Sequence, residues 1–205
     1  MIKGTPELIA ERREIIINAC ERLYETMSFK QISIKEIAQI VPFSRPTIYN
    51  YFETKEEIFL ALFKREYDRF NEELEAILKE NEVLSKEELA KKIAASLSQR
   101  KQLLKLLSMN NYDMEANSRQ ELLTSFKASY GNTLKLMREL LKKFIPEKTE
   151  NDIETFIYIF FPFMFGIYPY TEVTEKQRIG MKDAGVDYTY HRAYELIYDC
   201  LMKLL

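Results

Sequence analysis

The sequence predicts an all-α protein with a small N-terminal head of three helices and a larger C-terminal helical domain. Three observations predict this class. Gly and Pro number only 5 and 6 in 205 residues, which is too few for the many turns of an all-β chain. Hydrophobic residues make up 46% of the chain and recur at the i, i+3, i+4, i+7 spacing of amphipathic helices. Several of these apolar stretches follow a helix-capping box, Ser/Thr-x-x-Asp/Glu.

The first helix is predicted to begin at Thr5 and Pro6. A threonine hydroxyl caps free backbone N–H groups, and proline is tolerated in the first turn because its missing N–H would be unpaired there. One apolar stripe follows, which predicts a helix that faces a core. Its members are Ile16, Ala19, Cys20, Leu23, Tyr24 and Met27.

Residues 33–52 are predicted to form two short helices joined by a tight turn. Ser33 and Glu36 make a capping box for the first helix, and Pro42 ends it because the residue before proline avoids the α region. Ser44 is placed to cap the second helix. On a helical wheel of about 100° per residue, Ser44, Ile48 and Phe52 face inward. The outward face then consists of Pro46, Thr47, Tyr49 and Asn50, with Arg45 at the exposed N-terminal corner.

A long helix is predicted over residues 55–80, because Thr54 and Glu57 form another capping box and no breaker follows before about Glu80. A helix of this length can leave one bundle and enter another. We therefore expect the boundary between residues 1–53 and 54–205 to lie within it.

The remaining chain is predicted to be helical with polar connections. Helices are expected after Ser85, over 103–107, over 119–144, after Thr149 and over 188–205, with a connection at 110–113 and a long loop or broken helix at 171–187. The apolar stretch 156–170 is shorter than the ~20 residues of a spanning helix, and Pro162, Gly166 and Pro169 interrupt it. No signal peptide is evident at the N-terminus. We expect a cytoplasmic protein that does not enter a membrane.

Composition argues against several classes of function. The chain contains only Cys20, Cys200 and His191 as thiols and imidazole, so we expect neither a Cys/His zinc site nor a nucleophile–base pair. We predict no metal, no cofactor and no enzymatic activity. A net charge of −2 and a pI of about 5.7 exclude a uniformly basic coat, but they leave room for a local face that binds phosphates.

The two short helices have the organisation of a helix-turn-helix, in which the second helix enters the major groove of DNA. Arg45, Thr47 and Asn50 suit base edges, since Arg pairs with guanine, Asn with adenine and the Thr methyl with thymine. Tyr49, Tyr51 and Lys55 suit phosphate oxygens, and the helix N-terminus at Ser33 and Lys35 offers backbone N–H groups to an anion. The expected DNA contacts are Ser33, Lys35, Ser44, Arg45, Pro46, Thr47, Tyr49, Asn50, Tyr51 and Lys55.

Over about residues 10–65 the sequence resembles the TetR family of bacterial transcriptional regulators. The resemblance lies in Ile34-Lys35-Glu36-Ile37-Ala38, in Ser44-Arg45-Pro46-Thr47-Ile48-Tyr49-Asn50-Tyr51-Phe52 and in Thr54-Lys55-Glu56-Glu57. It implies an all-α homodimer whose last two helices pair between subunits as a four-helix bundle. It also implies a C-terminal ligand cavity and a pseudo-palindromic operator on double-stranded DNA.

One position departs from the family pattern. Pro42 stands where relatives usually carry glycine in the turn between the two helices. Glycine allows a positive φ, which proline cannot adopt, so the turn needs another geometry. We expect the recognition helix to be presented nevertheless, because the flanking core residues are retained.

Two further sets of residues are candidates in the C-terminal domain. A small hydrophobic ligand is expected to meet aromatic residues and a few polar groups, namely Tyr112, Phe126, Tyr130, Phe161, Met164, Phe165 and Tyr168, with Asp113 and Arg119 as weaker polar candidates. The dimer interface is expected to use Phe156, Phe160, Tyr190, Tyr194, Ile197 and Leu201. Plain core packing is the alternative for any of these residues.

The sequence therefore favours a DNA-binding repressor that a small molecule releases from its operator. A ligand that prefers one state of the C-terminal domain would shift the long helix over 55–80 and change the separation of the two recognition helices. Two alternatives stay open: a DNA-binding helical dimer without a small-molecule effector, and a helical adaptor that does not bind DNA. A cavity filled by the protein's own side chains would favour the former.

Overall fold

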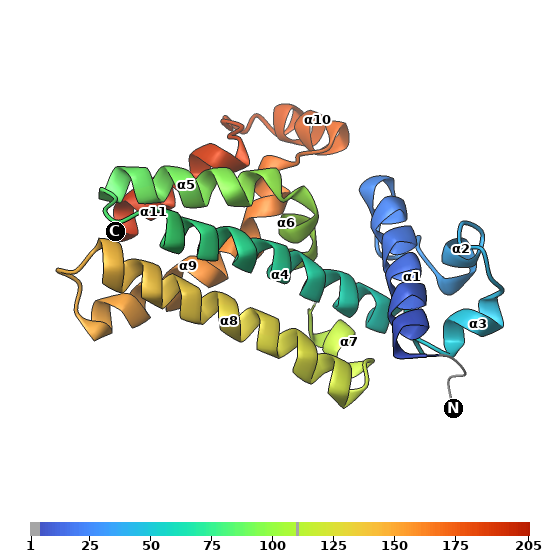
Figure 1. Ribbon diagram of the computed structural model, residues 1–205. Coiled ribbons are helices and arrows are strands. Elements are labelled where there is room, and N and C mark those ends of the chain that lie inside the picture. Colours follow the sequence, from blue (N-terminus) through green and yellow to red (C-terminus); the bar gives the residue numbers. More distant parts are fainter. Residues whose placement is uncertain (1–4, 110) are drawn as a thin grey trace. The chain divides into compact units, whose positions relative to one another are not determined.

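The computed structural model describes residues 5–109 and 111–205. Within this part of the chain all regular secondary structure is α-helical (Figure 1). The helices are α1 (Pro6–Thr26), α2 (Ile34–Ala38), α3 (Arg45–Tyr49), α4 (Lys55–Glu80), α5 (Lys86–Gln99), α6 (Lys101–Leu107), α7 (Asn111–Ala116), α8 (Gln120–Phe144), α9 (Glu150–Thr171), α10 (Glu175–Asp183) and α11 (Ala193–Leu204). The predicted all-α class is confirmed.

The helices form two compact units. The head unit runs to Asp68 and also includes residues 110–131, whereas the body unit consists of residues 69–109 and 132–205. Two long helices, α4 and α8, therefore contribute residues to both units. The domain boundary predicted within residues 55–80 stays a prediction. No pattern in the sequence indicates that residues near 120 belong with the head unit.

The core of the head unit lies between α1 and the N-terminal half of α4. Tyr24 of α1 and Phe29 pack edge-on against Phe59 of α4, with ring centroids 5.1 and 4.8 Å apart. Across the same contact Arg65 of α4 reaches two carboxylates of α1, at 3.0 Å for Glu14 and 2.9 Å for Glu21. The predicted apolar stripe of α1 faces this core, and these ion pairs fix α4 along it.

The predicted helix starts at Thr5, Ser33, Ser85 and Thr149 are confirmed. Each of these side chains accepts a backbone N–H of the first turn, and the last three form complete capping boxes. Thr174 and Gln177 make a further box at the start of α10. Gly185, with φ of +66°, ends α10, because this backbone conformation lets the N–H of Val186 bond the carbonyl of Met181 at 3.0 Å.

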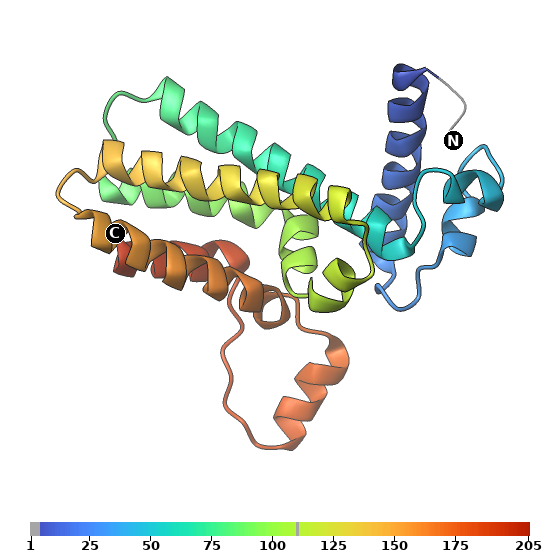
Figure 2. The same ribbon diagram turned by 90° about the horizontal axis from the view of Figure 1, so that it is seen from below.

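In the body unit α11 packs against α5 and α9, and α6 packs against α9 (Figure 2). α9 continues through Pro162 and Pro169, so the expectation that prolines interrupt this stretch is wrong. By length and composition alone α9 would pass as a membrane span. Its apolar side, which includes Ile153, Phe156 and Phe160, is buried inside the unit, as in a core helix.

Two predicted boundaries in the C-terminal part need correction. The connection expected at 110–113 is occupied from Asn111 by α7, and Asn110 lies outside the described residues. The stretch 171–187 contains α10, which suits the broken helix that was one of the two expectations. The last helix begins at Ala193 rather than Tyr188, because Glu195 bonds the backbone N–H of Arg192 at 3.0 Å and so fixes the start there.

Candidate nucleic-acid interface

The structure presents the recognition helix α3 at the surface of the head unit (Figure 1). Ile48 and the following Phe52 are fully buried, whereas Arg45, Pro46 and Tyr49 are exposed. Asn50 is also exposed and Thr47 is half-buried. The prediction that α3 is presented despite Pro42 is therefore confirmed.

The turn between α2 and α3 forms without any residue in the left-handed region of φ and ψ. Among the described residues no residue other than glycine has a positive φ, and Pro42 is exposed within the turn. One detail of the wheel is wrong, since Ser44 is exposed rather than inward-facing. Its hydroxyl lies 3.0 Å from the Thr47 hydroxyl and makes no cap bond to the backbone.

Two predicted DNA contacts form a pair on the exposed side of α3. The Nη2 of Arg45 donates to the Tyr49 hydroxyl at 3.0 Å, and the Arg45 guanidinium lies 5.6 Å from the centroid of the Tyr49 ring. Residues four apart share one face of a helix, so this pairing is local. It holds a planar cation with several N–H donors at the solvent-facing side of α3.

The N-terminus of α2 lies in the same unit. Lys35 is exposed, and its backbone N–H donates to the Ser33 hydroxyl oxygen at 3.1 Å. The Ser33 hydroxyl and backbone N–H both donate to the Glu36 carboxylate. Ser33 is thus engaged as a cap, while the Lys35 ammonium is the exposed charge that this helix start offers.

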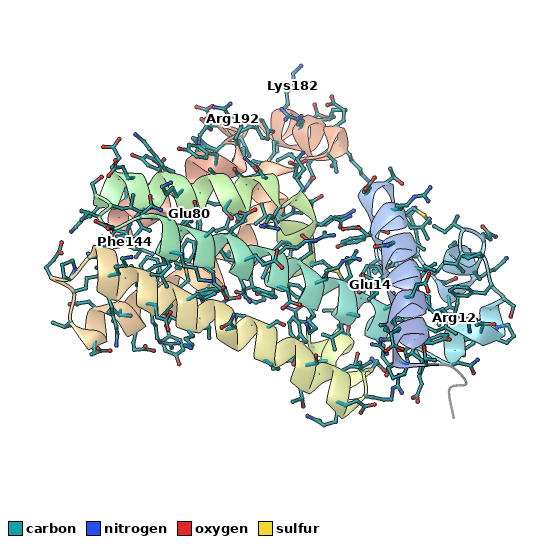
Figure 3. The ribbon with its side chains drawn as sticks, viewed as in Figure 1. Arg12, Glu14, Glu80, Phe144, Lys182 and Arg192 are labelled. Atoms are coloured by element: carbon teal, nitrogen blue, oxygen red, sulfur yellow. The ribbon has the colours of Figure 1, made fainter. Side chains whose placement is uncertain are left out.

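Two residues expected to bind phosphate have other roles in this structure. Tyr51 is only 2% exposed, and its hydroxyl accepts from Nη1 of Arg12 on α1 at 3.0 Å, a side chain labelled in Figure 3. The expectation that Tyr51 contacts phosphate is wrong for this conformation. The helical wheel contained the signal, because Tyr51 lies only about 60° from the buried direction of Ile48.

Lys55 ties α4 to the loop before α2. Its Nζ donates to the carbonyls of Phe29 and Ile32 at 2.9 and 3.2 Å, and it lies 4.0 Å from the Phe29 ring centroid. These contacts replace the expected phosphate contact in the described conformation. The sequence around Lys55 does not indicate which distant backbone carbonyls its side chain reaches.

The seven residues predicted for a ligand cavity do not line one pocket. Phe126 and Tyr130 pack on Tyr67 in the head unit, with centroids 5.9 and 5.4 Å apart, and Phe126 also lies 4.9 Å from Phe63. Tyr112 is 87% exposed, so its assignment to a pocket is wrong. Of the weaker polar candidates, Asp113 is exposed and Arg119 is engaged with Glu57.

The remaining four pocket candidates lie along α9 in the body unit. Phe161 and Met164 are buried, and Phe165 and Tyr168 are half-buried. A hollow of about 610 Å³ does occur in this unit, beside α10. None of the predicted pocket residues lines it; its walls include Tyr170, Val173, Met181, Tyr188 and Tyr190.

Most of the residues predicted for the dimer interface are buried inside their own chain. Phe156, Phe160, Ile197 and Leu201 are 0–1% exposed, so they stabilise the fold of their own chain. Tyr194 stacks on Tyr198, and Tyr190 packs under the Arg178 guanidinium. The opposite side of α9 carries the exposed apolar residues Tyr158, Ile159, Pro162, Gly166 and Tyr170.

One ion pair of the head unit was missed entirely by sequence reasoning. The Glu57 carboxylate is fully buried. It accepts hydrogen bonds from Arg119 Nε at 2.7 Å and from Arg119 Nη2 at 2.9 Å. Burial by itself raises the pKa of Glu57, but hydrogen bonds from Arg119 and from the Glu53 backbone outweigh it and lower that pKa. Residues 62 positions apart give no local signal of such a pair.

No other cluster suggests catalysis. Among the described residues no group of three or more His, Cys, Asp and Glu side chains is arranged to hold a metal ion. The Cys20 thiol is buried in the core of α1, and burial raises its pKa well above the ordinary value. The exposed face of α3 is therefore the candidate site that the structure supports.

Comparison with known proteins agrees with this geometry. Residues 16–62 match the family model described as bacterial regulatory proteins, tetR family. Residues 64–191, more than half of the chain, match the model described as tetracyclin repressor-like, C-terminal domain.

Curated relatives match over shorter stretches. The fatty acid metabolism regulator protein of Bacillus subtilis is 34% identical over 83 residues, which cover 40% of this chain and 42% of that protein. The HTH-type transcriptional regulator EthR of Mycolicibacterium smegmatis is 40% identical over 52 residues, 25% of this chain and 24% of that one. The chain thus spans between a quarter and two fifths of the length of these relatives.

Solved structures match over nearly the whole length and show the fold. The fatty acid degradation regulator FadR from Bacillus halodurans has a TM-score of 0.60 at 20% identity, and the match covers 100% of this chain and 97% of that one. FadR from Bacillus subtilis in complex with stearoyl-CoA has a TM-score of 0.58 at 21% identity, with 93% and 96% covered.

The buried pair predicts a specific pH dependence of stability. Because the folded-state pKa of Glu57 lies below its ordinary value of 4.5, its contribution is present above pH 4.5 and is lost as pH falls through the folded pKa. We expect Glu57→Gln to lower the free energy of unfolding at pH 7 by about 2–3 kcal/mol. The difference from wild type should shrink toward pH 3.5 in urea denaturation at fixed protein concentration.

The matched control is Glu154→Gln. Glu154 receives the same two-pronged contact from Arg138, at 2.5 and 2.9 Å, but its side chain is 41% exposed. Its loss should change the unfolding free energy much less than the loss of Glu57 does, because water screens an exposed ion pair. An equal loss for Glu57→Gln at every pH would contradict the linkage.

Proposed function

This chain belongs to the tetR family of bacterial regulatory proteins, and from that premise we propose that it is a cytoplasmic, sequence-specific DNA-binding regulator of transcription. The observation that carries the proposal is the exposed side of α3, anchored by the buried Ile48 and Phe52. A short helix held by two apolar anchors can enter a major groove with its polar side outward. The relatives named as HTH-type transcriptional regulators support the same reading.

The DNA contacts that we propose follow from exposure. Arg45 and Asn50 offer the side chains that pair with guanine and adenine edges, and both are exposed. Thr47 offers a methyl group for thymine, while Tyr49 and Lys35 offer a hydroxyl and an ammonium to phosphates. Ser33, Tyr51 and Lys55 are left out of this set because they are engaged within the head unit.

We propose that the protein acts as a homodimer through the exposed side of α9. A single head makes few contacts, so two heads on a pseudo-palindromic site give affinity and register together. Tyr158 is 72% exposed and Ile159 is 47% exposed, and Pro162 and Gly166 continue the same apolar face one and two turns further on. Apolar surface gathered on one helix face is typical of an obligate interface.

We further propose that the regulator is a repressor released from DNA by a small hydrophobic ligand. The structural relative from Bacillus subtilis holds stearoyl-CoA, which makes a long-chain acyl-CoA the ligand to test first. A ligand that binds one state of the body unit more tightly shifts the population toward that state. Since α4 contributes residues to both units, it is the element through which we expect the shift to reach the heads.

A second candidate function is a DNA-binding dimer without a small-molecule effector. The observation that favours it is the aromatic cluster of Phe63, Tyr67, Phe126 and Tyr130, whose ring centroids lie 4.9–5.9 Å apart in neighbouring pairs. Phe126 and Tyr130, which were expected to line a ligand cavity, thus pack against other aromatic side chains of the head unit.

Arg45→Ala and Tyr49→Phe test DNA binding. A duplex is first selected by the wild-type protein from a random-sequence library. We expect each variant to bind it about 10-fold more weakly, and Tyr49→Phe to leave the salt dependence of binding unchanged because the hydroxyl that it removes carries no charge. Affinities are measured by fluorescence anisotropy over a salt series. Arg192→Ala, at an exposed residue of the body unit, is the control; unchanged affinity in both test variants would refute the interface.

Ile159→Asp tests the dimer. A carboxylate at the centre of an apolar interface is unpaired and desolvated when the subunits meet. We expect sedimentation velocity to show a dimer for wild type and a monomer for the variant at micromolar concentration. Val83→Asp places the same charge at a residue that is 85% exposed and should leave the dimer intact. A dimeric Ile159→Asp protein would remove α9 from the interface.

The ligand is tested by release of the bound duplex. If the proposal is right, micromolar stearoyl-CoA lowers DNA affinity at least 10-fold, whereas coenzyme A alone has no effect because it lacks the apolar chain. Anisotropy of the labelled duplex measures the release, and calorimetry without DNA measures binding itself. No binding by stearoyl-CoA or free stearate would favour the second candidate function.

A further inference from the structure

We infer that Arg119, at the start of α8, is a positioning residue that fixes the orientation of the recognition helix through Glu57 and Tyr51. This inference deepens the proposed function and rests on it where DNA is concerned. Arg119 lies outside the helix-turn-helix in sequence, yet residues 110–131 belong to the head unit. Every group in the argument lies within that unit.

The first end of the connection is the carboxylate of Glu57 on α4. Its Oε1 accepts from Nε and from the backbone N–H of Arg119, at 2.7 and 3.1 Å. Its Oε2 accepts from Arg119 Nη2 at 2.9 Å and from the backbone N–H of Glu53 at 2.7 Å. A buried carboxylate with four donors is held in one position, because loss of any donor leaves a charge without compensation.

The second end is Tyr51, two residues beyond the end of α3. Its carbonyl accepts from Arg119 Nη2 at 3.3 Å and from Arg13 Nη1 at 3.2 Å. Its own N–H donates to the carbonyl of Ile48 at 2.9 Å. Cationic donors at the C-terminal end of a helix satisfy its free carbonyls and oppose the negative end of its dipole. Arg119 thus bonds both the residue two positions after α3 and the first turn of α4.

A further contact holds the segment from which Arg119 projects. The Thr54 hydroxyl donates to the carbonyl of Asn117 at 2.9 Å, and it accepts from the backbone N–H of Glu57 at 3.1 Å. The residues just before α8 are therefore fastened to the first turn of α4. Because the segment before α8 is fastened to α4, Arg119 cannot readily move with α3. The Arg119 side chain therefore fixes the position of the Tyr51 carbonyl, just after α3.

The consequence is that α8 has a direct connection to the recognition helix. α8 begins at Gln120, the residue after Arg119, and runs on to Phe144, beyond the residues that belong to the head unit. Any rotation of its first turn displaces the guanidinium that holds Tyr51. α4 is then not the sole route by which the C-terminal part of the chain reaches α3.

Hydrogen exchange of the DNA-free protein tests the connection first. In Arg119→Ala we expect the amides of Tyr51 and Phe52, which bond the carbonyl of Ile48, to exchange at least 10-fold faster than in wild type. The amides at the centre of α1 should be unchanged, since exchange reports local opening. Equal acceleration in α1 would show general destabilisation and overturn the inference, as would unchanged exchange at Tyr51.

Arg138→Ala is the matched control, because Arg138 binds Glu154 in the body unit with the same two-pronged geometry. It should leave exchange at Tyr51 and Phe52 unaltered. If Arg119→Ala does not fold, Arg119→Lys takes its place. A lysine retains the charge but cannot hold the Glu57 carboxylate and the Tyr51 carbonyl together, so the same acceleration at Tyr51 is expected.

DNA binding supplies the second measurement, on the duplex selected by wild type. Arg119→Ala should weaken binding about 10-fold with an unchanged salt dependence, because no phosphate contact is lost. A salt slope reduced by about one charge would mean that Arg119 itself touches DNA, and would overturn a positioning role. If wild type selects no sequence at all, the proposed function fails, whereas the exchange result still decides the connection.

Discussion

The head unit depends on the near-complete burial of the N-terminal half of α4. From Glu57 to Phe63 the side chains are 0–1% exposed, apart from the half-buried Ala61. A helix that is inaccessible all round needs covering on every side. α1 covers it with Tyr24 and with the carboxylates that hold Arg65, the loop before α2 covers it with Phe29, and α8 covers it with Phe126. These contacts fix α1, the loop before α2 and the start of α8 around α4.

That constraint explains why charged residues near α4 have such specific partners. A charge that is removed from water is tolerated only when its hydrogen bonds are met. Glu57 meets this condition with Arg119. Arg65 meets it in part: its Nη1 donates to Glu14 and Asn18, and its Nη2 lies 2.9 Å from the Glu21 carboxylate without a hydrogen bond. Lys55, at the rim, meets it with two backbone carbonyls. In each case the partner lies on a different segment, so the ionic contacts also fix how the segments meet.

What the sequence predicted well is what depends on residues within about four positions. The caps at Thr5, Ser33, Ser85 and Thr149 are local hydrogen bonds, and Ile48 and Phe52 share one side of α3 because they are four apart. What it missed depends on distant residues. Nothing near Arg119 indicates Glu57, and nothing near Lys55 indicates the carbonyl of Ile32.

The misassigned dimer face has a different cause. α9 is apolar on nearly all sides, so periodicity cannot tell the side that packs within the chain from the side that stays exposed. The two prolines of α9 were interpreted only as helix breakers, although their spacing also indicates which side of α9 is exposed. Pro162 and Pro169, seven residues apart, both lie on the exposed side. On that side the carbonyls they leave without an intrahelical donor are not enclosed by the chain's own core.

The buried pair between Glu57 and Arg119 also bears on modularity. A head of this type could be exchanged between regulators by a cut within α4, after Glu57. In this protein such a cut would separate Tyr51 and Glu57 from the arginine that completes them, because that arginine is encoded 62 positions after Glu57. A transplanted head would keep the exposed side chains of α3 and lose the arginine that bonds the Glu57 carboxylate and the Tyr51 carbonyl. The transferable part is discontinuous in the gene, and a working chimera must carry both pieces.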